Sequence, residues 1–208
     1  MTDEEQVLVI ERKVFDSLGA FQGLEFDVPR YLGALFVEGV PRFMSRRMAE
    51  NDPQFKQIIP YVIMRCDDRY LSYVRGARAG ESRLVGQRSI GIGGHINPVD
   101  QAPLFDTSFR ETYLAAVERE VREEVNVDTT YCDTIVALLN DDSNDVGRVH
   151  LGVVHLWELD SARVTKREQM ITQMAFMTGD ELRHARGSME TWSSLCVERL
   201  GEMAACTA

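Results

Sequence analysis

The clearest hydrophobic pattern in the chain lies before its midpoint, where two apolar, β-rich runs flank a short polar turn. The runs cover residues 61–65 and 69–74, and Cys66-Asp67-Asp68 separates them. Two such runs joined by a few turn-forming residues are typical of a β-hairpin. A further apolar run, Val7 to Ile10, predicts a strand near the start of the chain. Around these strands we expect only one short helix, within residues 29–52.

After a glycine-rich stretch at residues 91–94, the chain alternates helical and extended patterns. A strong helix is followed by the apolar run CDTIVALLND, the polar segment DDSNDVG and the extended segment RVHLGVVHLWEL. Residues 169–185 predict a short strand and the start of a helix, and residues 189–205 predict an amphipathic C-terminal helix. Strands, one strong helix, more strands and a final helix indicate a mixed α/β layer fold, because a doubly wound sheet would repeat βαβ units.

The strong helix is predicted to start near Ser108 and to continue to about Val125. Ser108-Phe109-Arg110-Glu111 has the S-x-x-E form of a capping box. Asn126 follows, and asparagine often ends a helix in the left-handed region. One apolar arc of this helix is expected to face the core; it consists of Leu114, Val117, Val121 and Val125.

A cluster of glutamates lies beside this arc, in the stretch EREVREEVNV. Glu120, Glu123 and Glu124 project within a wedge roughly 100° wide. Like charges one turn apart cost about 0.2–0.5 kcal/mol per pair, and i,i+4 pairs such as Arg119–Glu123 offset part of that cost. A solvated helix face is the plain interpretation. The other is a site for a hard divalent cation, which binds clustered carboxylates, beside a glycine turn where backbone can approach a phosphate.

Gly94, Glu111 and the run Arg119-Glu120-Val121-Arg122-Glu123-Glu124-Val125-Asn126-Val127 resemble the Nudix box. From Glu111 onward every spacing of that motif is kept. Asn126 replaces the motif's glycine, and sixteen residues (95–110) separate Gly94 from Glu111 where the motif has five. The segments SIGIGGHIN, DDSNDVGRVHLG and ETWS are also similar to a group of Nudix phosphoesterases. The resemblance implies an α/β Nudix fold, a mixed β-sheet sandwiched between helices. We expect a Nudix hydrolase domain at residues 56–208, ending in the C-terminal helix, with an N-terminal extension at residues 1–55 packed on it.

The resemblance also implies a chemistry, the hydrolysis of a diphosphate linkage in a nucleoside diphosphate derivative with Mg²⁺ or Mn²⁺ as cofactor. The expected metal ligands are Glu120, Glu123 and Glu124. The expected catalytic residues are Glu123, Glu124, Arg119, which would orient a glutamate, and Glu190, which would act as the base. The expected substrate-binding residues are Gly93, Gly94, His95 and Arg88. The plain alternative for Glu190 is an ordinary glutamate at a helix N-terminus.

Two other functions stay open. A non-catalytic Nudix-fold module for nucleotide binding or regulation would not need the glutamates, so their intact set argues against it. Isomerase chemistry on prenyl diphosphates would need an added cysteine and glutamate, and no motif supports Cys66 or Cys132 in that role.

The charge balance narrows the partners of the protein. Its 33 acidic and 23 basic residues give a formal net charge of −10, so no broad basic face is expected for a nucleic-acid backbone. A small-molecule substrate held through metal ions or a few arginines stays compatible with that charge. No apolar run approaches the roughly 20 residues of a membrane span, so no membrane partner is expected. The N-terminal extension either forms a homodimer contact or covers the sheet.

The remaining features have plain interpretations. The four cysteines show no CxxC spacing, and the acidic N-terminus lacks the basic flank of a signal peptide, which together predict a cytoplasmic protein with reduced thiols. In DDSNDVG, Val146 stands where a calcium loop needs glycine, so a polar inter-strand loop is expected. His150 and His155 lie five apart on one strand and are favoured as satisfied core histidines. Arg75, Arg83 and Arg88 are either solvated or contact substrate phosphates.

Overall fold

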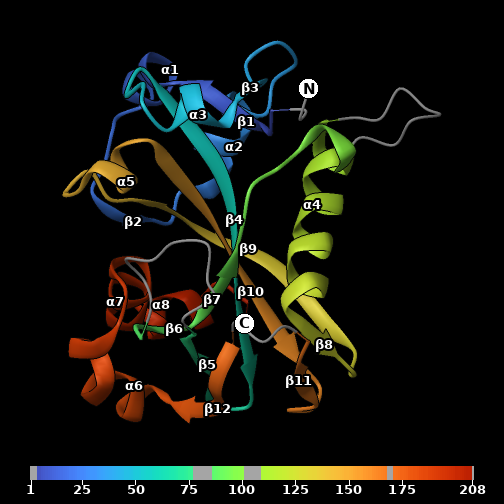
Figure 1. The fold of residues 1–208 in the computed structure, drawn as a ribbon. Helices are drawn as coiled ribbons and strands as arrows, with labels where there is room; N and C mark the ends of the chain where they lie inside the picture. The colour runs from blue at the N-terminus through green and yellow to red at the C-terminus, as the bar shows by residue number, and fades with distance from the viewer. Residues whose placement is uncertain (1–3, 77–85, 101–108, 168–170, 208) are drawn as a thin grey trace. The chain divides into compact units, whose positions relative to one another are not determined.

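A computed structural model of the chain describes residues 4–76, 86–100, 109–167 and 171–207. It shows an α/β fold with a large mixed sheet flanked by helices, which confirms the predicted fold class (Figure 1). The residues group into two compact units. Unit 1 comprises Met1–Pro60, Gly94–Arg119 and Ala137–Val153, and unit 2 comprises Tyr61–Gly93, Glu120–Val136 and Val154–Ala208. The division into an extension at 1–55 and a domain at 56–208 stays a prediction.

The main path through the sheet has the strand order β12-β5-β4-β10-β9-β2. These strands are β12 (Ile171–Thr178), β5 (Arg69–Arg75), β4 (Phe55–Cys66), β10 (His150–Leu159), β9 (Tyr131–Asn140) and β2 (Gly23–Glu25). Four short strands pair onto this path or onto each other: β1 (Gln6–Glu11), β3 (Arg42–Ser45), β6 (Arg88–Ser89) and β7 (Gly91–Gly93). A separate two-stranded sheet consists of β8 (Val125–Val127) and β11 (Val164–Lys166). The strands predicted at residues 7–10, 61–65 and 69–74 are therefore confirmed.

Strands β4 and β5 form the predicted hairpin. Cys66 pairs directly with Arg69, so the turn consists of Asp67 and Asp68 alone. Asp67 has a φ of 54°, in the left-handed region. Aspartate tolerates that region better than most residues, because its short polar side chain can hydrogen-bond locally. The predicted hairpin is therefore confirmed, and its turn is one residue shorter than predicted because Cys66 belongs to β4.

The helices are shorter and more numerous near the termini than the hydrophobic pattern predicted. They are α1 (Arg12–Ser17), α2 (Val28–Leu35), α3 (Arg46–Ala49), α4 (Phe109–Glu124), α5 (Asp145–Arg148), α6 (Gly179–Ala185), α7 (Thr191–Glu198) and α8 (Leu200–Ala205), with 3₁₀ turns at Pro98–Asp100 and Arg186–Ser188. The single helix predicted within residues 29–52 is wrong, because α2, β3 and α3 divide that region; Pro29 in the first turn favours the start of α2. The single C-terminal helix is also wrong, because Arg199, with φ −120°, interrupts it. No helix in the described ranges is both long and apolar enough to span a bilayer.

Unit 1 encloses a lysine at its centre. Lys56 on β4 is fully buried, and its Nζ donates to Asp142 Oδ1 at 3.0 Å and to the carbonyls of Gly147, Arg148 and His150 at 3.1–3.2 Å. Burial lowers the pKa of Lys56, and the hydrogen bond to Asp142 opposes that shift. Four oxygen acceptors compensate the ammonium for its lost hydration. They also bind the segment 141–148 to β4.

Both strand histidines are hydrogen-bonded. His150 Nδ1 lies 2.7 Å from the carbonyl oxygen of Val146 in unit 1, and His155 Nδ1 lies 2.8 Å from Asp133 Oδ1 in unit 2. Both side chains are buried. Their interpretation as satisfied core histidines is therefore confirmed.

Candidate active site

Helix α4 carries the glutamate cluster, and its bounds agree with the prediction to within one residue. Ser108, the predicted N-cap, lies outside the described residues. The side of the helix facing the core is formed by Tyr113, Ala116, Val117 and Val121. Leu114 is 38% exposed, so its predicted place in the core-facing arc is wrong. The larger ring of Tyr113 takes that place and packs against Phe36, with ring centroids 5.1 Å apart.

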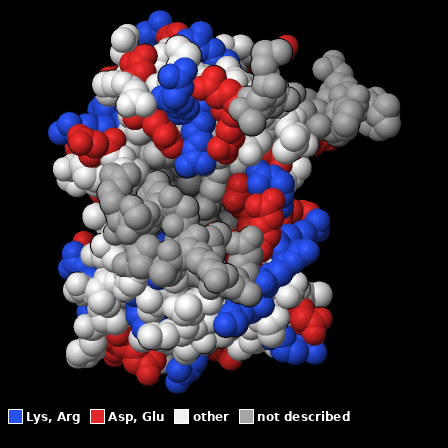
Figure 2. Space-filling view, in the orientation of Figure 1, with Lys and Arg blue, Asp and Glu red and all other residues white. Residues whose placement is uncertain are grey.

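The glutamates of the box lie beside the buried side of α4. Glu120 and Glu124 are half-buried and Glu123 is exposed. Figure 2 shows acidic side chains gathered beside basic ones where α4 runs. Within the described ranges, no three His, Cys, Asp or Glu side chains converge closely enough to hold a metal ion. Like charges one turn apart repel each other, which favours separation of these carboxylates. What fits a cation is the donor set, because three carboxylates in one wedge offer the oxygen ligands that Mg²⁺ and Mn²⁺ prefer.

Helix α4 runs directly into β8. Asn126 lies in that strand opposite Thr165, and its φ is not positive. Two hydrogen bonds from Arg167 complete the helix end: its N–H donates to the Glu124 carbonyl at 2.9 Å and its Nη1 to the Arg122 carbonyl at 2.9 Å. The prediction of a left-handed Asn126 is therefore wrong, because strand pairing and Arg167 satisfy the carbonyls that such a cap would serve.

Arg119 binds a carboxylate that the sequence did not single out. Its Nε donates to Asp100 Oδ1 at 2.7 Å and its Nη2 to Asp100 Oδ2 at 3.0 Å. Nη2 also donates to the carbonyl of His95 at 2.9 Å. Asp100 belongs to the segment that separates Gly94 from Glu111. Only its acidic character inside INPVDQAP could have signalled this role, and no motif spacing marked it.

The first residues of the glycine turn are held by strand pairing. Gly91 and Gly93 lie in β7, which pairs with β4. A Cβ on Gly91 would lie 2.1 Å from a ring carbon of Tyr61, so only glycine fits there. Gly94 and His95 follow β7 in the chain, and both are half-buried.

The imidazole of His95 is set in a cationic environment. Burial, followed by the positive charge of Arg46, the imidazole of His150 and the charge of Arg119, lowers the pKa of His95 to about 3. Its ring centroid lies 5.7 Å from that of His150. Its Nε2 is buried and has no hydrogen-bond partner among the described residues. The ring is therefore neutral near pH 7 and carries one unused polar atom.

Glu190 caps helix α7. Its carboxylate accepts hydrogen bonds from the N–H of Trp192 at 2.8 Å, the N–H of Ser193 at 2.8 Å and the hydroxyl of Tyr61 at 2.8 Å. Burial raises the pKa of the Tyr61 hydroxyl, so this donor stays protonated. The residue is thus the helix-terminal glutamate of the plain alternative, and its role as catalytic base stays a prediction.

Two arginines of unit 2 differ in their surroundings. Arg88 Nη1 donates to Ser72 Oγ at 3.1 Å and contacts Met177 Sδ at 3.5 Å. Arg75 is half-buried, and its Nε has no partner in the described part of the chain. Burial opposes the charged form of Arg75, yet its pKa is raised because the Tyr73 hydroxyl and the carboxylates of Glu124 and Glu190 favour that form. Arg75 is therefore the better candidate for an anion contact. Arg83 lies outside the described residues.

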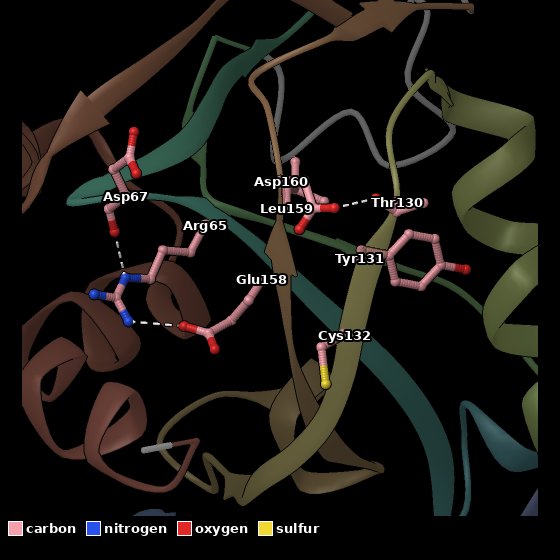
Figure 3. Close-up of a pocket in the computed structure, with 8 residues that line it drawn as sticks. All are labelled: Arg65, Asp67, Thr130, Tyr131, Cys132, Glu158, Leu159 and Asp160. Atoms are coloured by element: carbon pink, nitrogen blue, oxygen red, sulfur yellow. Dashed lines mark hydrogen bonds and ion pairs between the residues drawn. The ribbon is translucent and has the colours of Figure 1, made fainter.

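A hollow of about 510 Å³ opens elsewhere in unit 2 (Figure 3). It is lined by Arg65, Asp67, Thr130, Tyr131, Cys132, Glu158, Leu159 and Asp160. Arg65 donates to Glu158 at 2.9 Å and to the carbonyl of Asp67 at 2.7 Å, so its charge is already paired. None of these residues belongs to the predicted site.

The sequence and the fold were compared with known proteins. No protein-family profile matches the sequence. Protein YmaB of Bacillus subtilis (strain 168) is 36% identical over 206 residues, which cover 95% of this chain and 98% of that protein.

Among solved structures, Tm1382, which is assigned to the Nudix hydrolases, superposes with a TM-score of 0.76 at 30% identity, covering 94% of this chain and 98% of the other. A bifunctional NMN adenylyltransferase/ADP-ribose pyrophosphatase from Francisella tularensis, solved with AMP and a manganese ion, has a TM-score of 0.50 at 15% identity. It covers 71% of this chain and 42% of the longer protein, and at that identity it shows the fold alone.

Proposed function

Because the chain belongs to the Nudix hydrolase superfamily, we propose that it hydrolyses the diphosphate linkage of a nucleoside diphosphate derivative in a reaction that depends on Mg²⁺ or Mn²⁺. The observation that carries the proposal is helix α4, which presents Glu120, Glu123 and Glu124 along one side at the spacing of the Nudix box. A diphosphate repels anionic nucleophiles, so its hydrolysis needs positive charge at the phosphate oxygens and an activated water.

Different residues would bind the metal ion and the substrate. Glu120, Glu123 and Glu124 would hold the divalent ion, which when bound neutralises phosphate oxygens and lowers the pKa of a water. Glu120 and Glu124 are half-buried and Glu123 is exposed, so the carboxylate of Glu123 is the most accessible of the three to an arriving ligand. Arg75, a half-buried guanidinium whose Nε has no partner among the described residues, supports binding of an anionic group, because a carboxylate or phosphate would satisfy it. Gly93, Gly94 and His95 would contact the substrate through the turn.

The test is a screen of nucleoside diphosphate conjugates, dinucleotides and nucleoside triphosphates with Mg²⁺, in which products are identified. Glu123→Gln and Glu124→Gln remove a charged ligand at little change in size, and we expect each to reduce turnover by more than the about 100-fold that loss of a supporting residue can cost. Glu118→Gln is the matched control, because Glu118 is an exposed glutamate on the same helix at a position where the motif specifies no residue type.

Two results would contradict the proposal. Turnover that survives in both variants would remove the box glutamates from the reaction. Tight nucleotide binding without turnover of any substrate would instead identify a non-catalytic binding module.

A further inference from the structure

The segment that separates the glycine turn from α4 contributes one buried carboxylate, that of Asp100. Its side chain is only 2% exposed, and a carboxylate at such a position needs charged or hydrogen-bonding partners. Arg119 supplies them through two parallel bonds, Nε to Oδ1 at 2.7 Å and Nη2 to Oδ2 at 3.0 Å. A bidentate pair of this kind fixes the plane of the guanidinium as well as its position.

The same pair holds the backbone after the glycine turn. Arg119 Nη2 donates to the His95 carbonyl at 2.9 Å, and Asp100 Oδ2 accepts from the N–H of Asn97 at 2.8 Å. The N–H of Asp100 donates in turn to the Asn97 carbonyl at 3.0 Å. Between them, the carbonyl of Ile96 accepts a hydrogen bond from β1 at 3.0 Å. Each residue from 95 to 97 is therefore held, either by the Asp100–Arg119 pair or by β1.

We propose that Asp100 is a positioning residue that acts through Arg119, an inference that rests on the hydrolysis proposed above. Arg119 directly precedes Glu120 and lies one helical turn before Glu123. The positive charge of Arg119 at that position would repel a divalent cation held by the glutamates, most strongly where water is partly excluded. Asp100 neutralises that charge and keeps the guanidinium in one orientation. Asp100, which lies among the residues between Gly94 and α4, thereby supports the box.

The rival explanation is an ion pair that stabilises the fold and does nothing for the reaction. A positioning role differs from it in three ways. Loss of a positioning residue lowers kcat more than it changes KM. The loss follows removal of either the carboxylate charge of Asp100 or the bidentate guanidinium of Arg119. It also weakens metal binding at temperatures where the protein is fully folded.

Three variants separate these explanations. Asp100→Asn keeps the size of the side chain and removes its charge, Asp100→Glu keeps the charge, and Arg119→Lys keeps a cation and removes the fork. Asp180→Asn is the matched control, because Asp180 forms an exposed ion pair with Arg183 at 2.6 Å in unit 2. Each variant is assayed well below its melting temperature, with kcat and KM measured in Mg²⁺ on the substrate found for the wild type. Mn²⁺ affinity is measured separately by electron paramagnetic resonance of the free ion.

We expect kcat to fall by about 10–100-fold in both Asp100→Asn and Arg119→Lys, with a much smaller change in KM, as for residues that support metal ligands. The double variant should lose no more than the worse of the two single variants, because both break one unit. Asp100→Glu should recover part of kcat, Mn²⁺ affinity should weaken in Asp100→Asn, and Asp180→Asn should match the wild type.

Wild-type kcat in Asp100→Asn would overturn the inference, and so would single-variant losses that multiply in the double variant. If Asp100→Asn does not fold, Arg119→Lys carries the same test alone. A wild-type protein that turns over no diphosphate substrate would contradict the proposed function instead. In that case the Mn²⁺ affinities still decide on Asp100: a value that falls in Asp100→Asn and not in Asp180→Asn supports the inference, and equal values overturn it.

Discussion

The imidazole of His95 lies half-buried next to Gly94, with Arg46, Arg119 and His150 as its charged or titratable neighbours. Sequence placed this histidine beside the glycine turn and assigned it to substrate binding. It could not supply the neighbours, because Arg46 and His150 are about 50 residues away in the chain on either side. Burial, followed by these neighbours, lowers the pKa of His95 and keeps the ring neutral, so any contact with a ligand would use an uncharged nitrogen.

A neutral His95 makes stability depend on pH. Its pKa falls from about 6.5 in the unfolded chain to about 3 in the folded protein, so the unfolded state binds the extra proton between those values. The contribution of His95 is therefore fully present above pH 6.5 and is lost as the pH falls toward 3, by up to about 1.4 kcal/mol per pH unit. We expect His95→Gln to flatten this part of the profile when the free energy of unfolding is measured in urea from pH 7 to 4. The exposed His184→Gln serves as control, and an acid limb unchanged in His95→Gln would contradict the assignment.

Helix α4 is the element that the sequence predicted best, although its C-terminal end was not predicted. Its length and buried side follow from apolar spacing and helix propensity, which act within the helix itself. Its C-terminal end depends on Arg167, which is more than 40 residues further along the chain. The same reason explains the missed helices α1–α3: each is eight residues or shorter, and short helices depend on tertiary packing more than on propensity.

The conformation of Asn126 gives a test at this scale. The residue is extended in β8, so Asn126→Gly should lower the free energy of unfolding by about 0.5–1 kcal/mol through the added freedom of the unfolded chain. Asn126→Thr should be neutral or stabilising, because β-branched residues suit strands. Both values come from urea denaturation. A left-handed Asn126 would reverse the two signs, because glycine is preferred and threonine is disfavoured there.

At the scale of the whole molecule, the fold class and the position of the box glutamates on one helix could be predicted, and the contacts around Arg119 could not. The glutamates lie within one helix, so their relation follows from helix geometry. The Asp100–Arg119 pair joins residues nineteen apart through a segment whose path no periodicity describes. The hydroxyl that donates to Glu190 likewise comes from Tyr61, more than 120 residues earlier in the chain.

The metal site proposed on α4 predicts that a divalent ion stabilises the folded protein. A ligand that binds only the folded state adds about 2.7 kcal/mol at 100 times its Kd, and a protein of this size gains about 2–4 °C in Tm per kcal/mol. We expect Mg²⁺ or Mn²⁺ to raise the Tm of the wild type in calorimetry, and to raise it much less in Glu123→Gln or Glu124→Gln. Glu118→Gln should keep the wild-type response. A wild-type Tm that does not change when either ion is added would count against a metal site on α4.

Lys56 gives the segment 141–148 an uncommon property. The sequence DDSND partly resembles that of calcium-binding loops. Here, oxygens of Asp142, Gly147, Arg148 and His150 also surround a cation. That cation is an ammonium covalently attached to the neighbouring strand. The segment is therefore supplied with its counter-ion when the chain is synthesised, in a fixed one-to-one ratio, and its shape does not depend on which ions the surrounding solution contains.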